Sequence, residues 1–583
     1  MTVTATATAT ATAADLPPRP VTPPAPGADP TGGPWHRRAR VPLIATTCAL
    51  PLYVLWARVL ATGGGDLAAQ EAWAGFVARH PGSAYNLSWY GGLHTGGYSL
   101  ISPYLMAAFG VVPVSAASGL ASTWLTGRLW AESGVRRAQW PALMAALMLW
   151  CQVASGRTTF MLGVAFGLAA VLAGMGGRGG RRTVLTAVCA ALTTMASPVA
   201  ALFLVVVGVS CAARAPERRW AAAAAMVLPP AAVLGLSAWL FPFQGEQPMP
   251  YERLWPPLLM GVVVALVVPR SWRVLRSAAV VYAVGVVLAC LIPSPVGTNA
   301  ERLANLVAPP VLLAAAMTAS VRIRTAGAGP SRSVDALGTW RRACAGIALV
   351  LALTWVGGNT AAHVADTRKV PRWAADSGGV VRALERLGAD RARVEVVMAR
   401  SHREAAVLAP YVNLARGWNR QADVERGRLF YDGYGGAGVP AGTFSAAAYR
   451  AWLDHWAVGF VVLHDGPLDA ASEREYALVT SGPAYLEAVW RDEHWRVYRV
   501  RDAVALVDPP GSVVSSDSAG LVVRMPRPGT VTLRIAHSRW LRAEGGCLAP
   551  ADDGSGLTRL SVSRPGDVTV GSADGIGGRP CAR

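Results

Sequence analysis

Long apolar runs recur through the first 360 residues, and they restrict the fold more than any other feature of the chain. A bilayer core about 30 Å thick requires about 20 apolar residues in a helix. We therefore expect about eleven membrane-spanning helices, at 41–60, 99–126, 139–155, 158–175, 183–196, 197–213, 220–241, 255–269, 276–293, 303–321 and 342–359. Hydrophobic residues make up 52% of the 583 residues and charged residues only 15%, which favours a membrane protein over a soluble one.

The placement of arginine predicts how these helices are oriented. With the N-terminus in the cytoplasm, each inner connection carries several arginines, among them Arg136, Arg181, Arg218, Arg273 and Arg341. Outer connections carry single arginines, as the positive-inside rule requires. We therefore attribute the net charge of +19 to the arginines of the inner connections, and we expect no nucleic-acid partner. An odd number of spans then places the residues after about 360 outside the cell membrane.

Composition divides the chain into four parts. Residues 1–36 repeat Thr-Ala and then turn to proline, which predicts a disordered cytoplasmic tail. Residues 37–360 hold the spans and one long outer loop, 61–98. Residues 361–500 mix helical and strand patterns and predict an extracytoplasmic α/β domain. Residues 501–583 alternate apolar and polar residues between prolines and glycines, which is typical of a β-sandwich.

Two of the eight cysteines, Cys547 and Cys581, belong to the outer part of the chain. In an oxidising compartment they would pair and close a loop worth about 3–4 kcal/mol on the chain-entropy estimate. Two free thiols are the alternative. The other cysteines lie in or beside the spans, where we expect small buried hydrophobic residues. No cysteine or histidine spacing resembles a zinc site, so we name no metal ligands.

The first outer loop is the longest connection between the expected spans, and long loops on a rigid scaffold often carry function. It places Asp66 and Glu71 close to the outer end of the first helix. Partial burial at a membrane surface raises the pKa of a carboxyl group and suits it to act as a general base. Both acids are therefore catalytic candidates, with solvated loop residues as the alternative.

The same loop returns to the membrane through a glycine-rich aromatic stretch, residues 89–105. Its glycines permit bends in the chain. We expect its aromatic residues, among them Trp89, Tyr98 and Tyr104, to anchor the second helix at the lipid headgroups. His94 has no apolar role there and shares the loop with Asp66. It is our third catalytic candidate.

These features resemble the GT-C superfamily of membrane glycosyltransferases: a first span, a long outer loop with an early acid, an aromatic return limb, many spans with basic inner loops and an extracytoplasmic domain. The resemblance implies transfer of a sugar from a polyprenyl-phosphate carrier in the lipid bilayer to a glycan acceptor of the cell envelope. It implies that Asp66 is the base and that Glu71 assists it. Because the chain lacks a tight Asp-x-Asp pair, a divalent metal cofactor is left open.

If the resemblance holds, two further outer connections would face the same active-site cavity as the first outer loop. One carries Glu246 and Arg253, and the other carries Asn299 and Arg302 at the start of a helix. Arginine binds phosphate through two parallel hydrogen bonds, and helix N-termini favour anions. We expect these residues to bind the substrate, with Arg302 on the phosphate. An ion pair with Glu301, or a contact between Arg302 and headgroups, is the alternative.

In the outer domain, residues 413–433 are dense in arginine, amide and aromatic side chains. Such side chains suit sugar recognition, and Trp418, Arg420 and Tyr431 are the candidates. Docking of this domain onto the membrane part is the alternative.

Two other functions fit the sequence less closely. The inner connection at 127–140 resembles the basic loop of major facilitator transporters in Gly127, Gly134 and its arginines, but Ala131 stands where that family has its aspartate. A secondary transporter is therefore one alternative. A non-catalytic envelope assembly protein, in which Asp66 has no chemical role, is the other.

Overall fold

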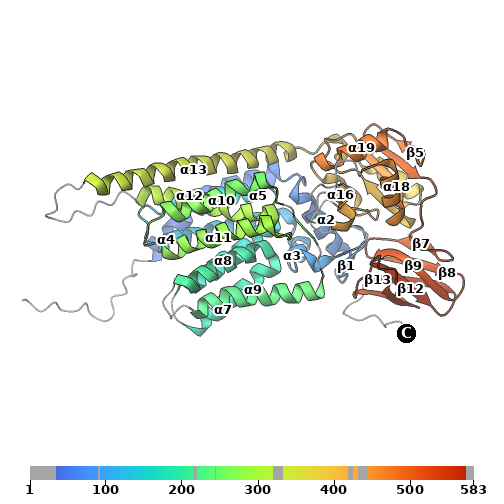
Figure 1. The fold of residues 1–583 in the computed structure, drawn as a ribbon, viewed down its shortest axis with the longest axis horizontal. Coiled ribbons are helices and arrows are strands. Elements are labelled where there is room, and N and C mark those ends of the chain that lie inside the picture. The colour runs from blue at the N-terminus through green and yellow to red at the C-terminus, as the bar shows by residue number, and fades with distance from the viewer. Residues whose placement is uncertain are drawn as a thin grey trace, which may run out of the picture.

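The computed structural model describes residues 35–89, 92–176, 179–214, 220–242, 245–247, 249–318, 332–417, 424–430 and 444–572. A helical bundle occupies one end of the long axis, and the strand-rich C-terminal part occupies the other (Figure 1). The expected disordered tail, 1–36, lies almost wholly outside the described residues.

Apolar helices form the bundle, and each expected span overlaps at least one of them. They are α1 (Trp35–Leu55), α4 (Val111–Glu132), α5 (Gln139–Ala154), α6 (Thr158–Met175), α7 (Gly180–Ala196), α8 (Pro198–Arg214), α9 (Trp220–Leu240), α10 (Tyr251–Val267), α11 (Arg273–Leu291), α12 (Glu301–Thr318) and α13 (Arg332–Thr367). The span expected at 99–126 is divided between α3 (Ser102–Phe109) and α4. Large apolar side chains such as Leu228 and Val350 are exposed on the outside of the bundle, as a lipid-facing surface requires.

The number of helices that are long and apolar enough to cross a membrane is six among the described residues. It is seven if α3 (Ser102–Phe109) and α4, which meet at a bend of 113°, count as one span. The helices α5, α7, α8 and α10 have only 16 or 17 residues each. A largely helical protein with several helices long and apolar enough to cross a membrane is therefore confirmed, while the count of eleven spans stays a prediction.

The connection at 61–98, called the first outer loop after its predicted location, is largely structured. It continues from a π-helical turn at the end of α1, η1 (Trp56–Leu60), into α2 (Asp66–Arg79). The rest forms a short hairpin of β1 (Tyr85–Asn86) and β2 (Leu93–His94), a 3₁₀ turn η2 (Thr95–Gly97), and α3.

The α/β unit of the outer part has one sheet with strand order β3-β4-β6-β5. The strands are β3 (Arg393–Val396), β4 (Val458–His464), β5 (Leu486–Arg491) and β6 (Trp495–Val500). The helices are α14 (Arg372–Ala375), α15 (Gly378–Arg386), α16 (Arg403–Leu408), α17 (Val424–Gly427), α18 (Ala446–His455) and α19 (Glu473–Thr480), with short 3₁₀ turns at Ala389–Arg391 and Ala470–Ser472. Strands β3 and β4 are parallel, and the other pairs are antiparallel.

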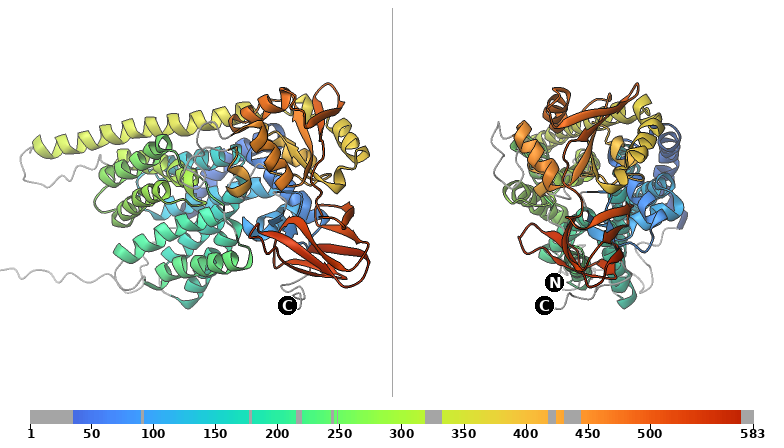
Figure 2. Two further views of the ribbon diagram at one scale, coloured as in Figure 1. Left: turned by 45° about the vertical axis from the view of Figure 1, so that its right-hand side comes forward. Right: turned by 90° about the vertical axis from the view of Figure 1, so that its right-hand side faces the viewer.

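The last unit packs two antiparallel sheets face to face, with strand orders β10-β13-β8-β7 and β11-β12-β9. The strands are β7 (Ser512–Ser516), β8 (Gly520–Met525), β9 (Gly529–Ala536), β10 (Leu541–Glu544), β11 (Cys547–Pro550), β12 (Leu557–Val562) and β13 (Gly566–Ser572). Alternate residues such as Leu521, Val523 and Leu533 share one buried cluster. The strand-rich C-terminal region is thus confirmed, and Figure 2 shows this unit beside the α/β unit.

The expected disulfide involves one residue that the structure does not describe. Cys547 begins strand β11, whereas Cys581 lies outside the described residues. Pairing of the two cysteines stays a prediction.

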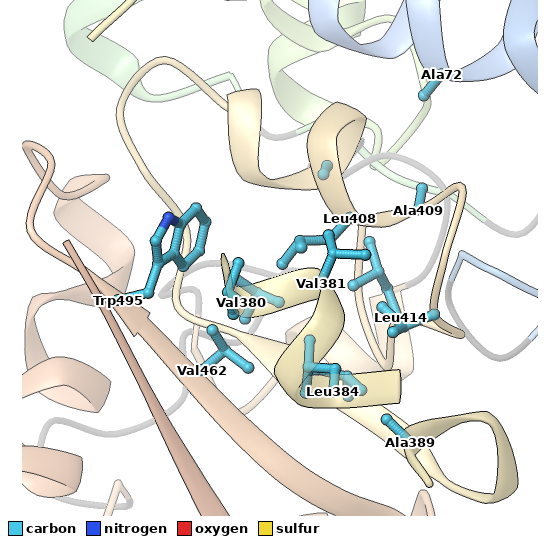
Figure 3. Close-up of a cluster of buried hydrophobic side chains, with 14 of the residues drawn as sticks. Ala72, Val380, Val381, Leu384, Ala389, Leu408, Ala409, Leu414, Val462 and Trp495 are labelled. Carbon is cyan, nitrogen blue, oxygen red and sulfur yellow. The ribbon is translucent and has the colours of Figure 1, made fainter. Parts of the chain in front are cut away.

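Helix α2 belongs to two hydrophobic cores at once. Leu67 packs with Tyr53 and Val153 inside the bundle. On another face, Ala72 and Trp73 join a cluster made mostly of the α/β unit, shown in Figure 3. The helix therefore fixes the outer part of the chain onto the membrane part.

The turn before α2 requires glycine at Gly65. Its φ of 63° and ψ of −137° lie where a side chain is rarely tolerated, and an added Cβ would come 2.6 Å from the His363 ring. We predict that Gly65→Ala destabilises the protein by about 1–3 kcal/mol. The measurement is the apparent Tm in detergent. Gly285→Ala is the matched control, because a Cβ added there in α11 meets open space; equal Tm values for the two variants would contradict the prediction.

Candidate functional site

A cavity of about 340 Å³ lies where the bundle meets the outer part of the chain. The first outer loop contributes Asp66, Ala69, Gln70, Trp73 and Tyr98, and the turn into α6 contributes Gly156, Arg157, Thr158, Thr159 and Phe160. The connections before α10 and α12 and the first residues of those helices contribute Gln247, Arg253, Thr298, Asn299, Glu301 and Arg302. One further lining residue, His402, belongs to the outer α/β unit.

Asp66 and Arg302 face each other across this cavity. The distance from Arg302 Nη2 to Asp66 Oδ2 is 3.9 Å, and the two side chains are 13% and 31% exposed, respectively. The guanidinium of Arg302 also lies over the Phe160 ring, 5.4 Å from its centroid. At 3.9 Å the ion pair is loose, and the carboxylate of Asp66 is still open to the cavity.

Arg253 and Glu301 form a second, tighter pair. Arg253 Nε and Nη2 donate to the two carboxylate oxygens of Glu301 at 2.9 and 3.2 Å. Glu301 is buried, and Arg253 is half exposed. Beside them, the side-chain amide of Asn299 donates to the Pro295 carbonyl at 3.4 Å. Sequence reasoning had selected Arg253, Asn299 and Arg302, and all three line the cavity together with Asp66.

Arg157 adds a third guanidinium, and it donates to a neutral side chain. Its Nη1 donates to Gln152 Oε1 at 2.7 Å, and burial lowers its pKa to about 10. Gly156, with φ of 72°, lets this turn approach the Cβ of Asp66 closely. The described lining residues thus carry three arginines but only two carboxylates, Asp66 and Glu301. This balance favours an anionic ligand.

The remaining candidates from the first loop lie elsewhere. Glu71 is exposed, and its carboxylate lies beside Gly63, 2.5 Å from the position that a Cβ there would take. His94 Nε2 lies 2.8 Å from Ser538 Oγ in the β-sandwich, and burial lowers its pKa to about 4. His94 is therefore neutral at physiological pH and joins the loop to the sandwich. Neither residue is among those that line the cavity.

Of the four other substrate-binding candidates, only Glu246 is among the described residues. Glu246 is half-buried and does not line it, whereas the next residue, Gln247, does. Trp418, Arg420 and Tyr431 lie outside the described residues.

Two of the expected membrane anchors face protein instead. Trp89 is 1% exposed and packs edge-on against Trp73. Tyr98 contacts the same tryptophan edge-on, 5.9 Å between ring centroids, and lines the cavity. The anchoring interpretation was wrong for both, because helix α2 and the outer unit cover this part of the loop. Tyr104, on α3, is 42% exposed and keeps that interpretation.

Sequence reasoning missed Gln70, Arg157 and His402 as site residues. Gln70 follows Asp66 by four residues on α2, so both lie on one helix face, and Thr159 Oγ1 donates to its Oε1. That spacing was visible in the sequence. Arg157 appeared only as a single outer arginine, and no sequence signal placed His402 here.

The described residues offer no ligand set for a divalent metal. Among the described residues, no group of three or more His, Cys, Asp or Glu side chains could hold a metal ion. The two carboxylates of the cavity each face an arginine.

No protein-family model matches this chain, and no curated protein matches it. The similarity to GT-C enzymes thus stays an expectation from the sequence.

A buried acid on α16, two residues after His402 in the chain, makes the fold sensitive to pH. Glu404 on α16 is 2% exposed, its Oε2 has no hydrogen-bond partner among the described residues, and burial raises its pKa to about 8. Between about pH 4.5, near the pKa of an unperturbed glutamate, and pH 8, the folded protein holds a proton that the unfolded chain releases. Stability therefore falls as pH rises through this range.

We predict that Glu404→Gln, which mimics the protonated acid, reduces the fall in apparent Tm between pH 5 and pH 8. Glu385→Gln on α15 is the control, because Glu385 is exposed. An unchanged pH dependence in the Glu404 variant would contradict the assignment.

Proposed function

We propose that this chain is a membrane glycosyltransferase of GT-C type. It would transfer a sugar from a polyprenyl-phosphate carrier to a hydroxyl group of a cell-envelope glycan, on the extracytoplasmic side. The observation that supports this most is the cavity in which Asp66 and Arg302 face each other beside Arg157. The reaction requires a general base and cations that bind a phosphate, and this cavity offers the Asp66 carboxylate for the first role and the two guanidinium groups for the second.

In the proposed reaction Asp66 accepts the proton of the acceptor hydroxyl. The hydroxyl oxygen forms a bond to the anomeric carbon while the bond from that carbon to the carrier phosphate breaks. The phosphate leaves with the electron pair and gains a negative charge. Arg302 and Arg157 would stabilise this charge, which is larger in the transition state than in the donor. Asp66 is the first residue of helix α2, so its carboxyl group lies at the end of the helix that borders the cavity.

A lipid-linked donor is supported by the surface next to the cavity. Tyr251 and Trp255 at the start of α10 are 71% and 65% exposed, and Arg253 lies between them in the chain. Leu291 and Ile292, at the end of α11, are also exposed. A carrier chain in the bilayer could contact these apolar side chains while its phosphate reaches the arginines.

We predict that Asp66→Asn lowers sugar transfer by about 100-fold or more, because the general base is lost. The measurement is transfer of radiolabelled sugar from polyprenyl-phosphate donors to envelope glycan in proteoliposomes. Asp376→Asn is the control, since Asp376 is an exposed acid at the end of α14. Wild-type transfer by the Asp66 variant would refute the proposal. Substrate flux in sealed vesicles without a covalent product would favour the transporter.

The proposed orientation has its own test. Ser133, after α4, and Ser481, after α19, are both exposed. We predict that a membrane-impermeant maleimide labels Ser481→Cys in intact cells and labels Ser133→Cys only after permeabilisation. The exposed Cys48 is first replaced by serine. Labelling of both positions, or only of Ser133→Cys, in intact cells would contradict an extracytoplasmic outer part.

A further inference from the structure

We infer that the outer α/β unit completes the cavity: His402 is a substrate-facing residue, and Arg403 is the positioning residue that holds it there. The role of His402 in transfer rests on the proposed function, whereas the positioning role of Arg403 is independent of it.

The segment that carries these residues leaves the carboxyl end of a parallel strand. Strand β3 ends at Val396, and residues 397–402 connect it to α16. Ligand sites in sheets with parallel strands lie beyond these carboxyl ends. The backbone of the connection is held by Val397 N–H to the Val462 carbonyl at 3.1 Å and by Arg400 N–H to the Pro467 carbonyl at 2.8 Å. It is therefore a fixed part of the sheet edge.

Arg403 ties this connection to two ends of the membrane bundle. Its Nη2 donates to Thr62 Oγ1 at 2.6 Å and to the Thr367 carbonyl at 3.1 Å, and its Nη1 donates to the Thr62 carbonyl. Thr62 follows α1, and Thr367 ends α13. A Cβ at Gly64 would lie 2.8 Å from the same guanidinium, so the glycine provides the space for it. Lysine could not make this forked set of bonds.

A second bond fixes the start of α2 to the same connection. The Gly65 N–H donates to the Ser401 carbonyl at 2.7 Å. Ser401 and Arg403 thus hold the turn that ends at Asp66, and His402 lies between them. His402 has φ of 54°, a left-handed conformation that is uncommon for a residue with a side chain and is typical of functional sites. Held in this way, His402 lines the cavity together with Asp66 and Arg302.

The position of His402 indicates which substrate it contacts. It is the only described lining residue from the outer unit, whereas the arginines come from the bundle. An imidazole can both donate and accept a hydrogen bond. His402 would orient the acceptor hydroxyl toward Asp66, and the arginines would bind the donor phosphate.

The positioning role is tested without any transfer assay. Full-length protein in nanodiscs is examined by hydrogen exchange, with the peptide that covers residues 61–66 as the readout. We expect Arg403→Lys and Arg403→Ala to exchange at least about tenfold faster there than wild type. Arg400→Ala is the control, because Arg400 is exposed on the same connection. Thr62→Ala, which removes one acceptor, provides a milder variant if the others do not fold. Unchanged exchange in these variants overturns the positioning role.

The role of His402 is tested by His402→Asn, since asparagine tolerates a left-handed backbone. We expect a KM for the acceptor raised at least about tenfold, with undecaprenyl phosphate retained as in wild type in native mass spectrometry. Loss of that lipid, or an unchanged KM, overturns the assignment. If Asp66→Asn transfers normally, the proposed reaction fails, while the exchange experiment still decides the positioning role.

Discussion

The double burial of helix α2 is the constraint on which the arrangement of this protein depends. Leu67 lies in the core of the bundle, while Trp73 lies in the core of the outer α/β unit. Two cores that share one short helix cannot shift independently without exposing apolar surface, and interiors are packed too densely to deform gradually. Asp66, the first residue of α2, therefore has a fixed position between the membrane part and the outer part.

Electrostatics in the cavity follow from that position. Buried charges are costly unless they are paired, and Glu301 is already engaged by Arg253. Asp66 is then the remaining carboxylate for Arg302 and Arg157 among the described lining residues. A ligand that carries negative charge would relieve the imbalance. This charge imbalance is the physical argument for the proposed phosphate-bearing substrate, and it does not depend on any similarity to known enzymes.

The α/β unit and the β-sandwich are also joined to the first outer loop and the helical bundle by hydrogen bonds. The first outer loop contacts both of them: the Leu414 N–H donates to the Ser88 carbonyl at 3.0 Å, and the Leu87 N–H donates to the Ser518 carbonyl at 2.7 Å. In the sandwich, Trp540 Nε1 also donates to the Leu240 carbonyl, at the end of α9. Docking onto the membrane part was the alternative interpretation of residues 413–433. Leu414 contacts the first outer loop in this way, whereas Trp418, Arg420 and Tyr431 lie outside the described residues.

The sequence by itself determined where the apolar helices lie and that the C-terminal part is rich in strands, because hydrophobic length and alternation are local properties. It also selected Asp66 and Arg302, since an acid and an arginine at outer helix starts are visible without a fold. It ranked Asp66 above Glu71 but kept both as catalytic candidates. Five residues along a helix turn the side chain by about 140°, and this excludes Glu71 from the cavity only once α2 is known to begin at Asp66. Only the tertiary structure decided that Arg157 and His402 join Asp66 in lining the cavity, because packing brought together segments far apart in the chain.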